Sequence, residues 1–238
     1  MARRPVRKSA GKPARNSSAR GAAAPTNARD KIIAALLALL VEQRMEEIGL
    51  AAVAEQAGVS LEQLRGEFGS KLAILAAHIK AVDRAVLAAD LSDMAEEPPR
   101  ERLFDVLMRR LEVLAPHREA VKSLLRSASR NPPLALALNG LAVRSQQWML
   151  TAAGVDASGP RGMVRAQGLA VLFGGVLRVW IKDDDAGLAR TMAALDRALA
   201  RGQRFAGLLD DVCRVPSRLC RLRPRRRRAD DAEESAAA

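Results

Sequence analysis

Apolar residues recur at the spacing of α-helices through most of this chain, and no segment shows the alternation typical of a β-strand. Aromatic residues make up only 3% of the chain, so its apolar content is mainly Ala, Leu and Val, which favours helix over sheet. The sequence therefore predicts an all-α protein. We expect helices at residues 30–49, 50–57, 60–68, 70–90, 117–130, 133–153, 162–182 and 186–212, and another that ends at Pro116.

The positive charge of the chain is confined to its two ends. Residues 1–29 carry eight Lys or Arg and no acid, and residues 214–228 carry eight Arg before the four acids of residues 229–238. Residues 30–213 hold 23 basic and 23 acidic residues, so the predicted folded region is neutral. We interpret residues 1–28 as a disordered basic arm and residues 213–238 as a basic, then acidic, tail.

Several classes of function are disfavoured by what the chain lacks. Two His and two Cys are too few for a multi-ligand zinc site or a disulfide framework. The sequence has no Gly-rich phosphate loop, nucleophile elbow or paired-His motif, so we predict no catalytic residues, no metal and no cofactor. Charges interrupt every apolar stretch and no secretory signal is recognised, so we expect a cytoplasmic protein that is not integral to a membrane.

A turn near the N-terminus predicts a helix-turn-helix. Gly58 lets one short helix end with a positive φ, Val59 can pack between two helices, and Ser60 can cap the next helix with Gln63 at its third position. A longer helix starts at Ser70. This order of elements presents the N-terminus of a short helix to a groove.

These residues resemble the N-terminal module of the TetR family of bacterial regulators. The resemblance rests on Val53 and Ala54, on the Ala57 to Ser60 turn, and on Leu64, Phe68, Ser70 and Lys71, within about 45 residues. It implies a TetR-like fold with a helix-turn-helix domain at residues 29–75 and a helical ligand-binding and dimerisation domain at residues 76–212. It further implies a transcriptional regulator that binds duplex DNA. The residues expected to contact the DNA are Ser60, Gln63, Arg65, Ser70 and Lys71, and of these Gln63 and Arg65 face base edges or phosphates.

The charge of this module leaves a second interpretation open. Glu62 and Glu67 both lie on the expected recognition helix, and residues 30–75 carry seven acids against four bases. Because DNA is a polyanion, an acidic module favours a helix-turn-helix that no longer reads DNA. The basic arm favours the opposite, because flexible arms contact phosphates or enter minor grooves.

In the C-terminal half, the resemblance implies a small apolar effector in the helical domain and a homodimer formed through the last two helices. Their apolar stripes need a partner to cover them. The scarce aromatic side chains and one leucine stripe form our expected ligand pocket: Phe104, Leu107, Leu111, Trp148, Phe173 and Trp180.

The same half is also similar to the TetR-fold lipid-binding proteins of ubiquinone biosynthesis, which carry a degenerate helix-turn-helix. The matching features are Trp180 followed by three aspartates and a helix containing Thr191 and Asp196. Beyond Val212, apolar residues interleave with Arg, a pattern typical of helices that dock on anionic membranes. The alternative function is therefore a lipid-binding accessory protein with a membrane-docking C-terminus.

Overall fold

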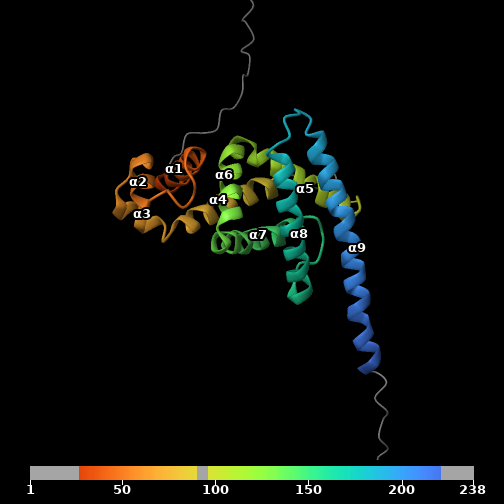
Figure 1. The fold of residues 1–238 in the computed structure, drawn as a ribbon. Coiled ribbons are helices and arrows are strands. Elements are labelled where there is room, and N and C mark those ends of the chain that lie inside the picture. The colour runs from red at the N-terminus through yellow and green to blue at the C-terminus, as the bar shows by residue number, and fades with distance from the viewer. Residues whose placement is uncertain (1–26, 90–95, 221–238) are drawn as a thin grey trace, which may run out of the picture.

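The computed structural model describes residues 27–89 and 96–220, and residues 205–220 only as part of a helix. Every regular element in these ranges is a helix, which confirms the predicted all-α class (Figure 1). Residues 1–26 of the predicted basic arm lie outside the described residues. The predicted membrane-docking segment after Val212 lies outside the described side chains. The elements are α1 (Ala28–Glu42), α2 (Leu50–Ala57), α3 (Leu61–Glu67), α4 (Lys71–Leu87), α5 (Pro99–Leu114), η2 (Ala115–His117), α6 (Arg118–Arg130), α7 (Pro132–Ala152), α8 (Gly159–Trp180) and α9 (Ala189–Cys220).

Two predicted helix ends differ most from the structure. The first helix was expected to reach Gly49, but α1 ends at Glu42 because Gln43 adopts an extended conformation. In the turn that follows α1, Arg44 pairs with Glu47 at 3.0 Å. The carbonyl oxygen of Met45 accepts a hydrogen bond from the Lys71 side chain on α4. The last helix was expected to end at Val212, but α9 continues to Cys220.

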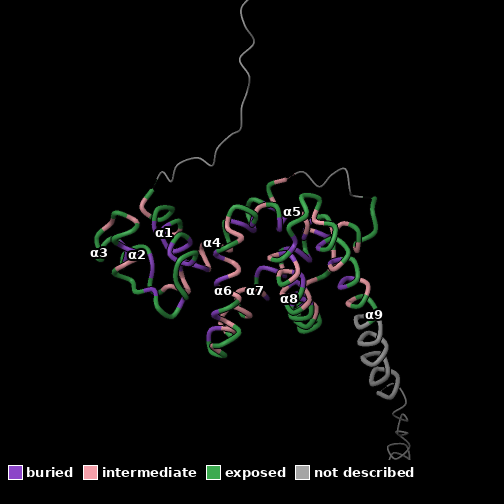
Figure 2. Tube along the Cα trace, turned by 45° about the horizontal axis from the view of Figure 1, so that its top comes forward, coloured by how far each residue is buried: buried purple, intermediate pink, exposed green. Residues whose placement is uncertain are grey.

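The buried side chains form two cores, and α4 belongs to both. Its N-terminal half places Ile74 and Leu75 among the residues of α1, α2 and α3, whereas Val82 and Val86 pack into the larger core of α5, α7, α8 and α9. The small and large helical groups lie at opposite ends of this helix (Figures 1 and 2). One continuous helix therefore joins the two cores, and the predicted domain boundary after residue 75 falls within it.

A buried ion pair fixes α4 against two other helices. The Asp83 carboxylate on α4 is paired with the Arg110 guanidinium on α5, and the Ser145 hydroxyl on α7 donates a 2.6 Å hydrogen bond to the same carboxylate oxygen. All three side chains are buried. Arg110 also lies over the ring of Phe173 on α8, 5.8 Å from its centroid. These contacts join four helices at one point in the large core.

Arg161, Arg165 and Arg178 interrupt the apolar sequence of the long helix α8. By length and composition alone, α8 is apolar enough to cross a membrane. It packs between α7 and α9, and its Phe173, Val176 and Trp180 are buried in the large core. Since core helices of globular proteins pass the same test, this single helix is weak evidence for a membrane protein.

Two histidines meet beside the buried ion pair. The rings of His78 on α4 and His117 in η2 lie edge to face with centroids 5.0 Å apart. Burial, the neighbouring His117 and the Arg110 charge together lower the pKa of His78 from 6.5 to about 4. His78 is therefore neutral in the folded protein at pH 7, whereas it gains a proton in the unfolded chain as the pH falls below 6.5.

We expect this difference to make the protein acid-sensitive. A base whose pKa is lowered by folding contributes stability above its unfolded pKa and loses it as the pH falls toward the folded value. Between pH 6.5 and 4, wild-type protein should lose up to about 3 kcal/mol of unfolding free energy relative to a His78→Gln variant, as measured by urea denaturation across pH. His117→Gln, at the half-buried partner, should give a smaller difference. Equal pH dependence in wild type and His78→Gln would contradict the assignment.

Candidate nucleic-acid interface and ligand cavity

The turn between α2 and α3 has the geometry that the sequence predicts. Gly58 adopts φ +65°, its N–H donates to the Glu55 carbonyl, and the Val59 N–H donates to the Ala54 carbonyl, which together form a Schellman motif. The Ser60 hydroxyl accepts the Gln63 N–H at 3.1 Å, and the Gln63 side chain accepts the Ser60 N–H at 3.0 Å. The predicted capping box is confirmed, and it sets the start of α3.

The short helix α3 is held by one face and presents the other to solvent. Leu64 is 2% exposed and anchors α3 in the small core, whereas Gln63 and Arg65 are exposed. Leu61, the first residue of α3, is 55% exposed although it is apolar. Sequence reasoning had missed Leu61, because an apolar residue at helical spacing is usually interpreted as core. The exposed face thus offers an amide, a guanidinium and an apolar group.

Arg29, in the first turn of α1, is bound to the end of α3. The guanidinium of Arg29 lies 3.3 Å from the Glu67 carboxylate, donates to the Glu67 carbonyl, and stacks over the Phe68 ring at 4.4 Å from its centroid. This contact offsets one of the two carboxylates that make α3 acidic. It could not be predicted from the sequence, because the partners are far apart in the chain and no periodic pattern links them.

The side chains of Ser70 and Lys71 both make hydrogen bonds to backbone groups of the protein itself. The Ser70 hydroxyl caps α4 by accepting the Ala73 N–H at 3.2 Å. The Lys71 ammonium donates to the carbonyls of Met45 and Ile48 at 2.6 and 2.5 Å, and partial burial lowers its pKa. Because an ammonium has three N–H donors, these two bonds leave Lys71 one donor for a phosphate.

We expect Lys71 to contribute to stability. Lys71→Met removes the partner of two carbonyls in the turn between α1 and α2, so the unfolding free energy should fall by about 1–3 kcal/mol in urea denaturation. Lys31→Met, an exposed lysine on α1, is the matched control and should change little. An unchanged stability combined with weaker DNA binding would instead identify Lys71 as a phosphate contact alone.

Most of the expected ligand-pocket residues lie in the large core. Leu107, Leu111, Phe173 and Trp180 are buried members of it, and Phe104 packs against it. Trp148 lies apart, with 60% of its surface exposed on α7. None of the six lines the cavity that the described residues form between α5, α8 and α9.

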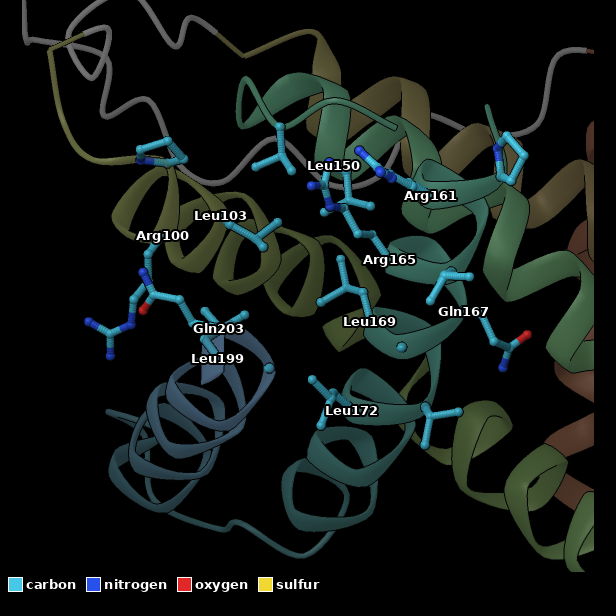
Figure 3. Close-up of a pocket in the computed structure, with 17 residues that line it drawn as sticks. Arg100, Leu103, Leu150, Arg161, Arg165, Gln167, Leu169, Leu172, Leu199 and Gln203 are labelled. Atoms are coloured by element: carbon cyan, nitrogen blue, oxygen red, sulfur yellow. The ribbon is translucent and has the colours of Figure 1, made fainter. Parts of the chain in front are cut away.

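That cavity lies between α5, α8 and α9 and has a volume of about 750 Å³ (Figure 3). Its walls are mostly apolar, and three arginines line it without any Asp or Glu. Sequence reasoning had missed it because its walls come from distant parts of the chain. The lining residues are Pro99, Arg100, Leu103, Leu150, Val155, Pro160, Arg161, Val164, Arg165, Gln167, Gly168, Leu169, Val171, Leu172, Leu199, Gly202 and Gln203.

The acidic run after Trp180 has a structural role. The Asp183 carboxylate accepts both the Thr191 N–H, at 2.8 Å, and the Thr191 hydroxyl, at 2.7 Å, which lowers the pKa of Asp183. Arg118 on α6 donates to the carbonyls of Trp180 and Asp183. These hydrogen bonds hold the loop between α8 and α9 in place. Within the described part of the chain, no group of His, Cys, Asp and Glu could hold a metal ion.

Comparison with known proteins identifies the fold. No protein-family model matches the chain, and no curated protein matches its sequence. A TetR transcriptional regulator from Rhodococcus sp. RHA1 is similar in structure, with a TM-score of 0.54 and 23% identity over 74% of this chain and 95% of that chain. A TetR transcriptional regulator from Nitrosomonas europaea ATCC 19718 has a TM-score of 0.57 and 21% identity over 74% and 97%. The chain therefore has the TetR fold.

Proposed function

We propose that this protein is a TetR-type transcriptional regulator of the bacterial cytoplasm that binds operator DNA as a homodimer and responds to a small apolar ligand. The observation that carries this proposal is the exposed face of α3, which begins at a capping box and follows a Schellman turn. The TetR fold supports it, because solved structures of that fold include transcriptional regulators. On this proposal the protein acts by binding and not by catalysis.

The exposed groups of α3 match the chemistry of base edges. A guanidinium such as that of Arg65 pairs with the two acceptors of guanine, and an amide such as that of Gln63 suits adenine. Leu61 adds an apolar group that fits the methyl of thymine. Ser60 and Ser70, at the starts of α3 and α4, supply hydroxyl and backbone groups for phosphates, with the remaining Lys71 donor beside them.

The acidic residues of α3 weaken this interaction, and the arm offsets them. Glu67 is paired with Arg29, whereas Glu62, an exposed carboxylate in the first turn of the helix, makes no ion pair with any described residue. The arm that leads to Arg29 carries seven further Lys or Arg residues. Arg29 directly follows this arm and is bound to the end of α3, so we expect the charges of the arm to favour DNA bound at the recognition helix.

A binding experiment with Arg65→Ala tests the proposal. We expect the full chain to bind a duplex from the DNA upstream of its own coding sequence more tightly than a scrambled duplex. Arg65→Ala should lose about 10–100-fold in affinity for the first duplex and little for the second, because a base contact carries about 1–3 kcal/mol of discrimination. Electrophoretic or anisotropy titrations across a salt series measure both affinities.

Arg144→Ala is the control, because Arg144 is exposed on α7, outside α3 and outside the dimer contact proposed below for α8 and α9. It should bind both duplexes as the wild type does. If wild-type protein binds the two duplexes equally at every salt concentration, the basic ends of the chain account for the binding, and this operator is excluded.

We place the dimer contact on the exposed face of α8 and the neighbouring part of α9. Val171 is 62% exposed, and a Cβ added at Gly174 or Gly175 would meet open space. Met192 on α9 is also exposed. Small residues let helices approach closely, and an apolar face of two helices can form a four-helix bundle with a second copy.

The Gly175→Arg variant tests this contact. The new side chain has room in the single chain, so the monomer should fold, but two-fold symmetry would bring two buried guanidinium groups together. We expect sedimentation velocity to show a dimer for the wild type and a monomer for Gly175→Arg at micromolar concentration. Gly140→Arg, at an open glycine on α7, is the control and should remain dimeric. A dimer that persists in Gly175→Arg would place the interface elsewhere.

A lipid-binding accessory protein is the second candidate function. Glu62 on α3 favours it because an exposed carboxylate opposes DNA, and the apolar cavity between α5, α8 and α9 supports it as well. The duplex titrations distinguish the two functions: no operator discrimination together with lipid in the purified protein would support the accessory role.

A further inference from the structure

We propose that the cavity between α5, α8 and α9 is completed by a second copy of this chain, so that a neutral apolar ligand bound in it stabilises the dimer. This inference rests on the proposed function, because it uses the ligand and the dimer contact proposed there, and it specifies how the two are coupled. It does not depend on DNA binding.

The cavity has a buried floor and an exposed edge. Leu103, Leu169 and Leu199 line it from α5, α8 and α9, and each is at most 8% exposed (Figure 3). Val164 and Val171 on α8 also line the cavity, but they are 53% and 62% exposed. A side chain that lines a cavity and still meets solvent lies at its mouth. In the single chain the cavity is therefore open along α8.

The mouth of the cavity and the proposed dimer contact belong to one surface of α8. Residues 166–177 of this helix contain no charged side chain. The exposed residues among them are Gln167, Gly168, Val171 and Gly175, which recur every three or four positions and so share one face. Val171 lines both the cavity and the groove between α8 and α9 that contains Gly175. A second copy that packs around Gly175 therefore extends over the mouth of the cavity.

The class of ligand follows from the apolar wall. The volume of about 750 Å³ lies within the range of about 300–1,000 Å³ typical of small-molecule sites. Two of the arginines in the lining already act on acids of this chain. Arg100 pairs with Glu101 at 2.9 Å and with Asp196. Arg165 donates to the Asp156 carbonyl at 3.1 Å, and its charge acts on the Asp156 carboxylate. A neutral apolar molecule needs neither of them.

The remaining arginines border the uncharged surface of α8. Arg161 lies about 21 Å from Gly175 along α8, because a helix rises about 1.5 Å per residue. Arg197 and Arg201 on α9 line the groove and are exposed, so their long side chains can keep the charge in solvent at its rim. The surface that a second copy would bury is therefore the apolar one between these charges.

A ligand in this cavity and a second copy over its mouth stabilise each other. The second copy removes from water the ligand surface that the single chain leaves exposed, and the ligand fills the space beneath the contact. Such a coupling is reciprocal: the ligand favours the dimer by the factor by which the dimer favours the ligand, typically about 5–150-fold. A two-fold dimer completes two cavities, so this factor acts twice on the dimer Kd.

Sedimentation velocity of the delipidated full chain, with and without the neutral apolar dye Nile red, tests this inference without DNA. Fluorescence titration of the dye at protein concentrations below and above the dimer Kd measures its affinity for monomer and dimer. We expect the dimer to bind the dye at least about 5-fold more tightly than the monomer. Saturating dye should lower the dimer Kd by the square of the measured ratio, because two cavities are completed in each dimer.

Two variants separate the dimer from the cavity. Gly175→Arg changes a residue outside the cavity lining, but as a monomer it should bind the dye only as weakly as diluted wild type does. Gly168→Leu should abolish dye binding, because Gly168 lines the cavity and a Cβ built on it would meet nothing within 4 Å. Gly140→Arg on α7 is the control and should match the wild type in both measurements. Thermal unfolding of each variant confirms that it remains folded.

Three results would overturn the proposal. Equal dye affinity in the wild-type dimer and Gly175→Arg, including no binding by either, would leave the proposed dimer intact but uncoupled from the cavity. A dimer Kd that rises with the dye would mean that the dye and the second copy compete for one surface. Unaltered dye binding in folded Gly168→Leu would place the dye elsewhere. A wild type that stays monomeric with and without dye would contradict the proposed dimer contact as well, whereas the duplex titrations test DNA binding separately.

Discussion

The buried pair between Asp83 and Arg110 is the constraint on which the arrangement of the helices depends. Removing one partner of such a pair leaves an uncompensated buried charge, which typically costs about 3–5 kcal/mol. The pair and the Ser145 hydroxyl therefore hold α4, α5 and α7 in one relative position. Because α4 also belongs to the small core, contacts made in the large core contribute to the position of α3, together with Ala120 on α6 and Leu134 on α7.

Because α4 belongs to both cores, it links the proposed DNA binding physically to the proposed ligand binding. The cavity and α4 are both in contact with α5, which contributes Leu103 to the cavity and Arg110 to the buried pair. A ligand that shifts α5 must either move α4 with it or disturb the pair. The N-terminus of α4 lies beside the turn that Lys71 holds, so such a shift reaches the proposed DNA-binding module.

The interface around α3 combines local and long-range contacts. The capping box and the Schellman turn form between neighbours in sequence, so they need only the right residue types at short spacing. The contact of Arg29 with Glu67 and Phe68 forms only after α1 has packed against α3. It changes the electrostatic interpretation of the module, because a carboxylate that opposes DNA in the sequence is paired in the fold.

The sequence by itself determined the helical class, most helix boundaries and the turn from Gly58 to Ser60, because periodicity, caps and turns act over a few residues. The tertiary structure alone decided that α1 ends before a turn bound by Lys71, that Leu61 is exposed, and that a cavity lies between α5, α8 and α9. It also placed most of the expected pocket residues in the large core and left Trp148 exposed. Which apolar stripe becomes core and which becomes cavity depends on how distant helices pack, and no local pattern records that packing.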